Sequence, residues 1–308
     1  MAAGDSEFVL GIDFGGTKVA LATATTAGAP VHSARLATNA VAGASQVLDR
    51  SFACAHDLIA ATDGECIAVG AVSPGIVRTD GVLLAPNVPG WGALALPTAL
   101  REGLPIDRIA LGNDVKAAAL AEARWGSLAG ADPGVLLQLG TGVAAGIVVG
   151  GDVLDGAHGA AGEIGYNLRG AHDGAGAADG RAPLEEAVGG RAIGERGGRL
   201  LGGSMSAAEV FASRDDRAQA LVDEALAELA AHVANLAIAI DPQRIAVGGG
   251  LMSQPERVLG ALDGRLRAAV PFPPELVPAA FVHDGGLRGA IALALGAIEP
   301  VGAEEAVG

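Results

Sequence analysis

Apolar, strand-like runs joined by glycine turns recur along this chain. Residues 8–23 contain two such runs on either side of a turn at Gly15-Gly16, a pattern that predicts a β-hairpin. Residues 134–149 repeat the pattern around a second glycine turn at 140–142. Two hairpins of one type predict a duplicated framework, and we expect both turns to face one anionic ligand.

The remaining hydrophobic pattern predicts strands and helices that alternate, as in an α/β protein. Apolar residues recur at helical spacing over 45–62 and 217–240, and the second helix should end before Asp241-Pro242. Ser206 and Glu209 have the spacing of a capping box. Further strands are expected at 31–38, at 66–77 with an interruption at 73–75, and at 244–251, a last helix at 287–298, and a frayed end at 299–308.

The stretch 109–126 joins a short apolar run to an alanine-rich run with high helix propensity. Asn113 and Asp114 lie where the strand ends and the helix begins, the usual position of a ligand in α/β proteins. The alternative interpretation is structural, with Asp114 capping the helix by accepting backbone N–H bonds.

The glycine turn at Gly15-Gly16, followed by Thr17 and Lys18 at the start of the second strand, is a candidate phosphate cradle. Its N–H groups can point at one anion, and the neighbouring Asp13 can hold a hydrated Mg²⁺ ion. The turn is not a Walker loop, which needs Gly-Lys-Ser/Thr followed by a helix. Taken alone, the segment could equally be an ordinary hairpin turn.

Three further polar side chains are candidate ligands, and two of them, Asn87 and Glu185, also have a structural interpretation. Asn87 lies beside Trp91 in a proline-rich loop, which is either a surface turn or part of a pocket. Glu163 lies in a glycine-rich loop and offers a carboxylate to a site. Glu185 lies at a predicted helix start, where its charge would also favour the helix dipole.

Composition and charge exclude several classes of protein. Half of the 308 residues are hydrophobic but only 3% are aromatic, so Val, Leu, Ile and Ala must build the core. The formal charge of −15 disfavours non-specific binding to nucleic acid or anionic membranes. Cys54 and Cys66 have no metal-ligand spacing and make no disulfide framework, which favours a cytoplasmic setting. We expect no signal peptide and no membrane-spanning run.

Seven short motifs together carry a family resemblance, although each is weak alone. They are GIDFGGTK at 11–18, PNVPGW at 86–91, GND at 112–114, GTG at 140–142, GAAGEIG at 159–165, VGGG at 247–250 and DGGLRGA at 284–290. In this order they resemble the ROK family of sugar kinases and related repressors, over nearly the whole chain.

The resemblance implies an α/β fold of the actin/hexokinase-like (ribonuclease H-like) type, with two domains and an interdomain cleft. Residues 1–115 and 287–308 would form a small N-terminal α/β domain, to which the last helix returns. Residues 116–286 would form a large C-terminal α/β domain. The resemblance also implies a homodimer, which is usual in the family. Its repressor members carry a helix-turn-helix domain, whereas few residues precede the first strand here, so we expect neither a nucleic acid nor a membrane as partner.

The resemblance also assigns residues to a kinase site. Asp114 would be the catalytic base. The sugar would be bound by Gly75, Asn87, Asn113, Asp114, Glu163, Tyr166 and Glu185. ATP, with Mg²⁺ through Asp13, would be bound by Asp13, Gly15, Gly16, Thr17, Lys18, Thr141, Gly142, Gly249 and Gly250.

One departure from the family concerns zinc. The usual zinc site joins a His after Glu-Ile-Gly to a C-x-C-G-x-x-G-C motif, but here Tyr166 replaces the His and residues 172–183 contain no cysteine. Structural zinc needs Cys or His ligands, and His172 alone with carboxylates is a poor substitute, so we expect no structural zinc. Because the same His helps to hold the sugar, Tyr166 should also reshape the sugar pocket.

The implied activity is that of an ATP-dependent hexose kinase, which transfers the γ-phosphate to the 6-OH of glucose or a glucose-like sugar. An amino-hexose such as kanosamine or glucosamine, or an N-acetyl-hexosamine, is the alternative substrate, since carboxylates bind ammonium groups well. A catalytically inactive sugar-sensing regulator is less favoured, because Asp114 and both glycine turns are intact.

Overall fold

Each half of the chain builds its own five-stranded sheet. In this computed structural model, which describes residues 6–78, 80–83 and 90–298, the chain divides into two compact units. Unit 1 comprises Met1–Ala118 with Asp284–Gly308, and unit 2 comprises Ala119–His283. The predicted frayed end at 299–308 lies outside the described residues.

Unit 1 contains a mixed sheet with the order β3-β2-β1-β4-β7. Its strands are β1 (Glu7–Phe14), β2 (Lys18–Thr25), β3 (Pro30–Ala37), β4 (Glu65–Ser73) and β7 (Ile109–Asn113), and a second, two-stranded sheet contains β5 (Ile76–Arg78) and β6 (Gly81–Leu83). Its helices are α1 (Ala44–Ala61), α2 (Leu96–Gly103) and α9 (Gly285–Gly296), with short 3-10 turns at Ala40–Ala42 and Trp91–Ala93. The interruption predicted at 73–75 therefore separates two strands that belong to different sheets.

Unit 2 contains a second mixed sheet with the order β10-β9-β8-β11-β12. Its strands are β8 (Gly134–Leu139), β9 (Val143–Val149), β10 (Asp152–Val153), β11 (Arg244–Gly248) and β12 (Glu275–Pro278). Its helices are α4 (Glu185–Val188), α5 (Gly190–Leu201), α6 (Ala207–Ala212), α7 (Asp216–Ile240) and α8 (Pro255–Ala269), with 3-10 turns at Ile164–Tyr166, Ala177–Asp179 and Gly250–Ser253. Helix α3 (Asp114–Trp125) begins in unit 1 and continues into unit 2.

The two sheets share one topology, which confirms the predicted duplication. In each, the first two strands form an antiparallel hairpin, β1 with β2 and β8 with β9. The first strand of each hairpin also pairs in parallel with a later strand, β4 or β11. A further parallel strand, β7 or β12, completes the sheet.

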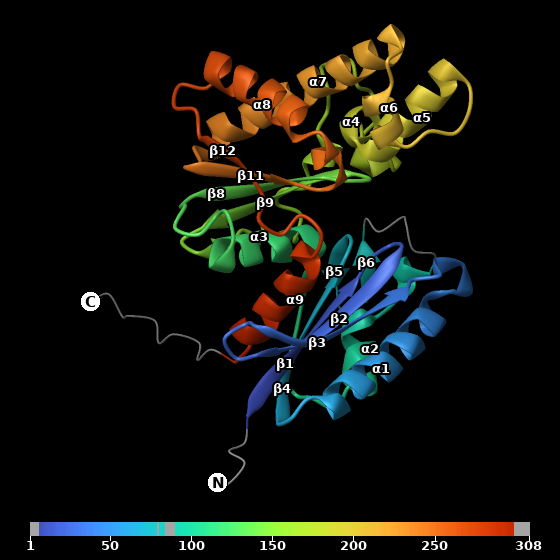
Figure 1. The fold of residues 1–308 in the computed structure, drawn as a ribbon, viewed down its shortest axis with the longest axis vertical. Coiled ribbons are helices and arrows are strands. Elements are labelled where there is room, and N and C mark those ends of the chain that lie inside the picture. The colour runs from blue at the N-terminus through green and yellow to red at the C-terminus, as the bar shows by residue number, and fades with distance from the viewer. Residues whose placement is uncertain (1–5, 79, 84–89, 299–308) are drawn as a thin grey trace. The chain divides into compact units, whose positions relative to one another are not determined.

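The last helix of the chain packs on the first strands. Helix α9, red in Figure 1, lies along β1 and β4, which are at the blue end of the colour scale. Two glycines make this close contact possible, because a Cβ built on Gly70 would lie 1.8 Å from the carbonyl oxygen of Ala290, and one on Gly11 would lie 2.8 Å from Ile291 Cγ1. The absence of a side chain at these two positions thus lets α9 approach the backbone of the sheet.

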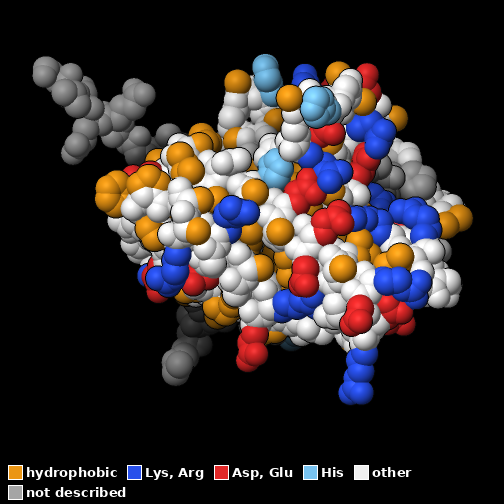
Figure 2. All heavy atoms as spheres, turned by 90° about the horizontal axis from the view of Figure 1, so that it is seen from above, with side chains coloured by type: hydrophobic (Ala, Val, Ile, Leu, Met, Phe, Trp, Pro, Cys, Tyr) orange, Lys and Arg blue, Asp and Glu red, His pale blue; other side chains and the backbone are white. Residues whose placement is uncertain are grey.

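Charged side chains of both signs are mixed on one face of the molecule (Figure 2). On the face drawn in Figure 2, Lys and Arg side chains lie beside Asp and Glu side chains. Ion pairs between elements of unit 2 include Arg196–Glu224 at 2.9 Å and Arg257–Asp223 at 2.7 Å. Among the described helices, none is long and apolar enough to span a membrane.

Candidate functional site

The parallel strands of unit 1 bring polar residues to one edge of its sheet. Asp13 of β1 pairs with Val72 of β4, and Ser73 of β4 pairs with Asn113 of β7. The carboxyl ends of three adjacent strands therefore lie together, which is where open α/β sheets bind ligands. Asp114 follows Asn113 directly as the first residue of α3.

Asn113, rather than Asp114, caps helix α3. Its Oδ1 accepts the backbone N–H groups of Val115 at 2.9 Å and Lys116 at 3.1 Å, and its Nδ2 donates to the carbonyl oxygen of Gly75 at 3.0 Å. The structural interpretation that made Asp114 the cap was therefore wrong by one residue, because the amide oxygen of Asn113 reaches the first two free N–H groups. Asn113 keeps one amide hydrogen for a ligand.

Asp114 and Asp13 are two partly buried carboxyl groups with raised pKa values. Burial raises the pKa of Asp114, although its Oδ1 accepts the N–H of Val115 at 2.9 Å. Burial also raises the pKa of Asp13 to about 7, with a further contribution from the charge of Asp114, and the nearby Lys18 acts in the opposite direction. A carboxylate whose pKa is raised towards neutrality is a stronger base, which suits proton abstraction.

We predict that Asp13 titrates at about pH 7 in the ligand-free protein, compared with 3.8 for an ordinary aspartate. The unfolded chain loses this proton at a pH near 3.8, whereas the folded protein keeps it up to about pH 7. The free energy of unfolding should therefore fall as the pH rises between these two values. Carboxyl ¹³C shifts of Asp-labelled protein measure the pKa directly. Asp114→Asn should lower it and Lys18→Met should raise it, whereas titration of Asp13 near pH 4 would contradict the assignment.

The glycine turn of unit 1 leaves backbone donors available beside Asp13. Within the described residues, no protein acceptor takes the N–H groups of Gly15, Gly16 or Thr17. Thr38 anchors the turn through two hydrogen bonds. Its Oγ1 donates to the carbonyl oxygen of Gly15 at 2.6 Å, and its N–H donates to the carbonyl oxygen of Thr17 at 2.9 Å. Lys18 begins the return strand and is exposed. Such a set of free amides can bind a phosphate group.

The second glycine turn is fixed against the start of α5 in unit 2. The N–H of Gly190 donates to the carbonyl oxygen of Gly140 at 2.9 Å, and that of Arg191 donates to the carbonyl oxygen of Thr141 at 3.1 Å. Within the described residues, the N–H groups of Thr141 and Gly142 bind no protein acceptor. The second turn thus resembles the first, with free amides on a turn that is anchored elsewhere.

Glu163, Tyr166 and Glu185 are brought together in unit 2. Burial raises the pKa of the Tyr166 phenol, and the charges of Glu163 and Glu185 raise it further. Glu185 Oε2 accepts the N–H of Val143 at 3.1 Å, so this carboxylate is fixed to the end of the second turn. A hollow of about 400 Å³ adjoins it and is lined by Thr141, Glu185, Glu186, Arg191, Ala192, Glu195 and Arg199.

Gly249 and Gly250 follow β11 and differ in their surroundings. Gly249 has a φ of +93°, and a Cβ there would lie 2.3 Å from the carbonyl oxygen of Leu139, so only glycine fits. Gly250 is exposed, and a Cβ there would meet no atom within 4 Å. Open space above Gly250 leaves room for a flat ligand to approach the backbone.

The predicted site residue Asn87 lies outside the described residues, but the neighbouring Trp91 is described. Trp91 is buried, and its Nε1 donates to Ser73 Oγ at 2.6 Å. The described part of this loop therefore packs into the core of unit 1 beside the sheet edge that carries Asn113.

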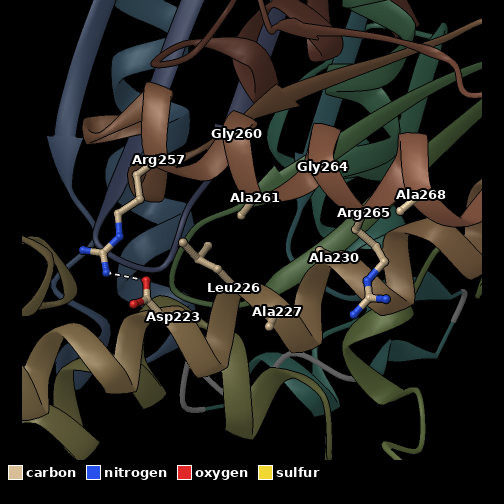
Figure 3. A pocket seen from close by; sticks show the side chains of 10 residues that line it. All are labelled: Asp223, Leu226, Ala227, Ala230, Arg257, Gly260, Ala261, Gly264, Arg265 and Ala268. Atoms are coloured by element: carbon tan, nitrogen blue, oxygen red, sulfur yellow. Dashed lines mark hydrogen bonds and ion pairs between the residues drawn. The ribbon is translucent and has the colours of Figure 1, made fainter.

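A separate groove of about 460 Å³ lies between α7 and α8 (Figure 3). Its walls are mainly alanine and glycine, and the Arg257–Asp223 ion pair crosses one end. None of the predicted site residues lines this groove. The small alanine and glycine side chains of α7 and α8 leave this groove open between the two helices.

The comparison that decides the family covers most of the chain. The sequence model of the ROK family matches residues 9–297. The chain belongs to the ROK family. The resemblance inferred from the seven motifs is thereby confirmed.

ROK proteins similar to this chain include sugar kinases. The glucokinase of Halalkalibacterium halodurans is 30% identical over 286 residues, which cover 84% of this chain and 85% of the relative. The N-acetylmannosamine kinase of Escherichia coli is 34% identical over 295 residues, which cover 93% of this chain and 98% of the relative. A ROK family glucokinase from Streptomyces griseus, solved in complex with glucose and AMPPNP, is 25% identical with a TM-score of 0.74, covering 93% and 99%. These similarities confirm the predicted actin-like α/β fold.

The region of this ROK protein that corresponds to the zinc site does not fit a zinc ion. Tyr166 offers a phenol in place of imidazole, and His172 is exposed. The nearby carboxylates have backbone partners, since Asp173 Oδ2 accepts the N–H of Arg169 at 2.6 Å. Among the described residues, no three His, Cys, Asp or Glu side chains form a group that could hold a metal ion.

Sequence reasoning missed two residues that support the site. Thr38 is buried and holds the first glycine turn, but nothing in the sequence links it to that turn, 21 residues earlier. Arg191 lines the hollow beside Glu185, with 3.9 Å between its guanidinium and the Glu185 carboxylate. The glycine pair Gly189-Gly190, directly before Arg191, could have indicated a close contact with the second turn, because both glycines pack against that turn.

Proposed function

We propose that this protein is an ATP-dependent hexose kinase that transfers the γ-phosphate to the 6-OH of glucose or a glucose-like sugar. The observation that carries the proposal is Asp114, a carboxylate with a raised pKa at the end of β7, which lies close enough to Asp13 to raise the pKa of that group. A base, a second carboxylate and a turn with free amides are the parts that phosphoryl transfer needs.

In this reaction the sugar hydroxyl oxygen forms a bond to the γ-phosphorus as the bond to the β–γ bridging oxygen breaks. Asp114 accepts the hydroxyl proton, and ADP leaves with the bridging oxygen. Asp13 suits a hydrated Mg²⁺ ion, which would supply positive charge to the phosphates. The free amides of Gly15, Gly16 and Thr17 are suited to phosphate oxygens. The complex of the Streptomyces griseus glucokinase with AMPPNP supports ATP as the donor.

The sugar would be bound by Asn113 and by Glu163, Tyr166 and Glu185. Carboxylates suit this role because each can accept two hydroxyl hydrogen bonds. An N-acetyl-hexosamine or a free amino-hexose is the second candidate substrate, supported by the similarity to N-acetylmannosamine kinases and by the acidic surroundings of Tyr166.

A coupled assay of ATP consumption across a sugar panel tests the proposal. The panel should contain glucose, mannose, glucosamine, kanosamine, N-acetylglucosamine and N-acetylmannosamine. Turnover of at least one hexose with formation of its 6-phosphate is the expected result. Sugar binding without turnover of any member would instead support a sugar-sensing regulator, and absence of both would refute the kinase.

A further inference from the structure

Residues 167–184 connect two parts of the proposed sugar site. The segment begins directly after Tyr166 and ends directly before Glu185, and its regular structure is limited to the 3-10 turn Ala177–Asp179. A loop of this length without strands or helices needs specific contacts to hold one conformation. Its two ends must keep a fixed spacing if Tyr166 and Glu185 are to bind one sugar.

An Arg–Glu pair fixes the first end of this loop to a rigid helix. The guanidinium of Arg169 forms a two-point contact with Glu228 of α7, with Nη2 at 2.8 Å from Oε2 and Nε bonded to Oε1. The hydrogen bonds that Arg169 donates to Glu228 raise the pKa of Arg169. Asn167 Nδ2 lies 3.5 Å from His232 Nδ1, one turn further along α7. Helix α7 buries ten of its side chains, so it is a firm support.

A second Arg–Glu pair fixes the other end to α4. Arg181 Nε donates to Glu186 Oε1 at 2.9 Å, and the N–H of Ala182 donates to the same oxygen at 3.0 Å. The bonds from Arg181 and Ala182 lower the pKa of Glu186 to about 2. Glu186 is the immediate neighbour of Glu185, so this pair restrains the backbone that carries the Glu185 carboxylate.

We propose that these two pairs, Arg169–Glu228 and Arg181–Glu186, form an ion-pair latch that positions Tyr166 and Glu185 for the sugar. The latch residues are positioning residues, since none of them is proposed to touch the substrate. The latch acts through charged two-point hydrogen bonds, which are stronger and more directional than neutral ones. The proposal rests on the proposed sugar-binding role of Tyr166 and Glu185.

Tyr166 offers a direct test, because it is the only tyrosine in the chain. Ultraviolet titration of its phenol needs neither substrate nor activity. Arg169→Glu should open the first pair of the latch, expose Tyr166 to water and move it away from Glu185, so the phenol pKa should fall towards its usual value of 10. If the latch stayed closed, the added negative charge at position 169 would raise the phenol pKa. Opening of the latch and the added charge alone therefore shift the phenol pKa in opposite directions.

The double variant Arg169→Glu with Glu228→Arg restores the pair with exchanged charges. It should return the phenol pKa to the parent value. Asp223→Arg, which breaks the Arg257–Asp223 pair on the same helix α7, is the matched control and should leave the phenol unchanged. A phenol pKa that rises in Arg169→Glu, or that the double variant fails to restore, would overturn the latch.

The kinetic readout separates the latch from the proposed function. Arg169→Glu should raise the KM for the accepted hexose about tenfold, the scale of one lost hydrogen bond, with kcat and the KM for ATP nearly unchanged. An unchanged hexose KM beside a lowered phenol pKa would also overturn the positioning role. If the parent phosphorylates no sugar, the proposed function fails, while the titration still decides whether the latch holds Tyr166.

Discussion

Asp114→Asn should lower kcat by about a hundred- to ten-thousandfold, the usual contribution of a general base. The amide oxygen can still accept the N–H of Val115, which Asp114 Oδ1 accepts at 2.9 Å, and Asn113 still caps α3. The variant should therefore fold and bind sugar as the parent does. It loses only the group that takes the hydroxyl proton.

Three measurements on this variant separate chemistry from binding. A coupled assay gives kcat, calorimetry gives the sugar affinity, and circular dichroism gives the melting temperature. Asp57→Asn on the exposed surface of α1 is a control of the same chemical change and should leave all three unchanged. Turnover of Asp114→Asn within a few-fold of the parent would remove Asp114 from the proposed mechanism.

Gly70→Ala should destabilise unit 1 by at least about 3 kcal/mol, the upper end of the usual cost of overpacking. The added Cβ would lie 1.8 Å from the carbonyl oxygen of Ala290 and 2.8 Å from the N atom of Ala294. Both atoms belong to the backbone of α9, so no side chain can move aside. The helix would have to leave β4, and with it the apolar residues that it buries there, which include Leu287, Ile291 and Leu295.

Urea unfolding followed by Trp91 fluorescence, in a Trp125→Phe background, measures this effect in unit 1. Gly264→Ala in α8 is the matched control, because a Cβ there meets no atom within 4 Å. It should be neutral or should stabilise the protein by up to about 1 kcal/mol, as alanine favours a helix. Equal unfolding midpoints for Gly70→Ala and its parent would contradict the packing of α9 on β4.

Much of the fold could be predicted from sequence because its signals are local. The glycine turns lie between apolar runs, and the structure has hairpins at both positions. The box of Ser206 and Glu209 is confirmed, with the Ser206 N–H donating to Glu209 Oε2 at 2.7 Å. Helix α7 ends at Ile240, directly before Asp241-Pro242, as the proline requires.

Contacts between distant residues could not be predicted in this way. Arg169 and Glu228 are separated by 59 positions, and neither has a local pattern that names the other. Glu122 looks like an exposed helix residue in the sequence, yet it is buried and accepts the N–H groups of Ser127 and Phe281. Such pairs depend on how strands and helices are arranged in space, which periodicity does not record.

For the site, the sequence identified residue types more reliably than their roles. Asn113 and Asp114 were both expected at the junction of strand and helix, and the structural interpretation made Asp114 the cap of the helix. The choice depends on backbone geometry within one turn, and the structure gives the cap to Asn113. Asp114 accepts the N–H of Val115 and has a raised pKa, and the raised pKa is the basis of its proposed catalytic role.

A crystal structure of Asp114→Asn with the accepted hexose and AMPPNP tests the central claim most directly. We expect the side chain of residue 114 within hydrogen-bond reach, about 2.6–3.2 Å, of the sugar 6-oxygen, with that oxygen aimed at the γ-phosphorus. A sugar bound with its 6-hydroxyl away from residue 114, or a nucleotide with its phosphates away from both glycine turns, would contradict the account.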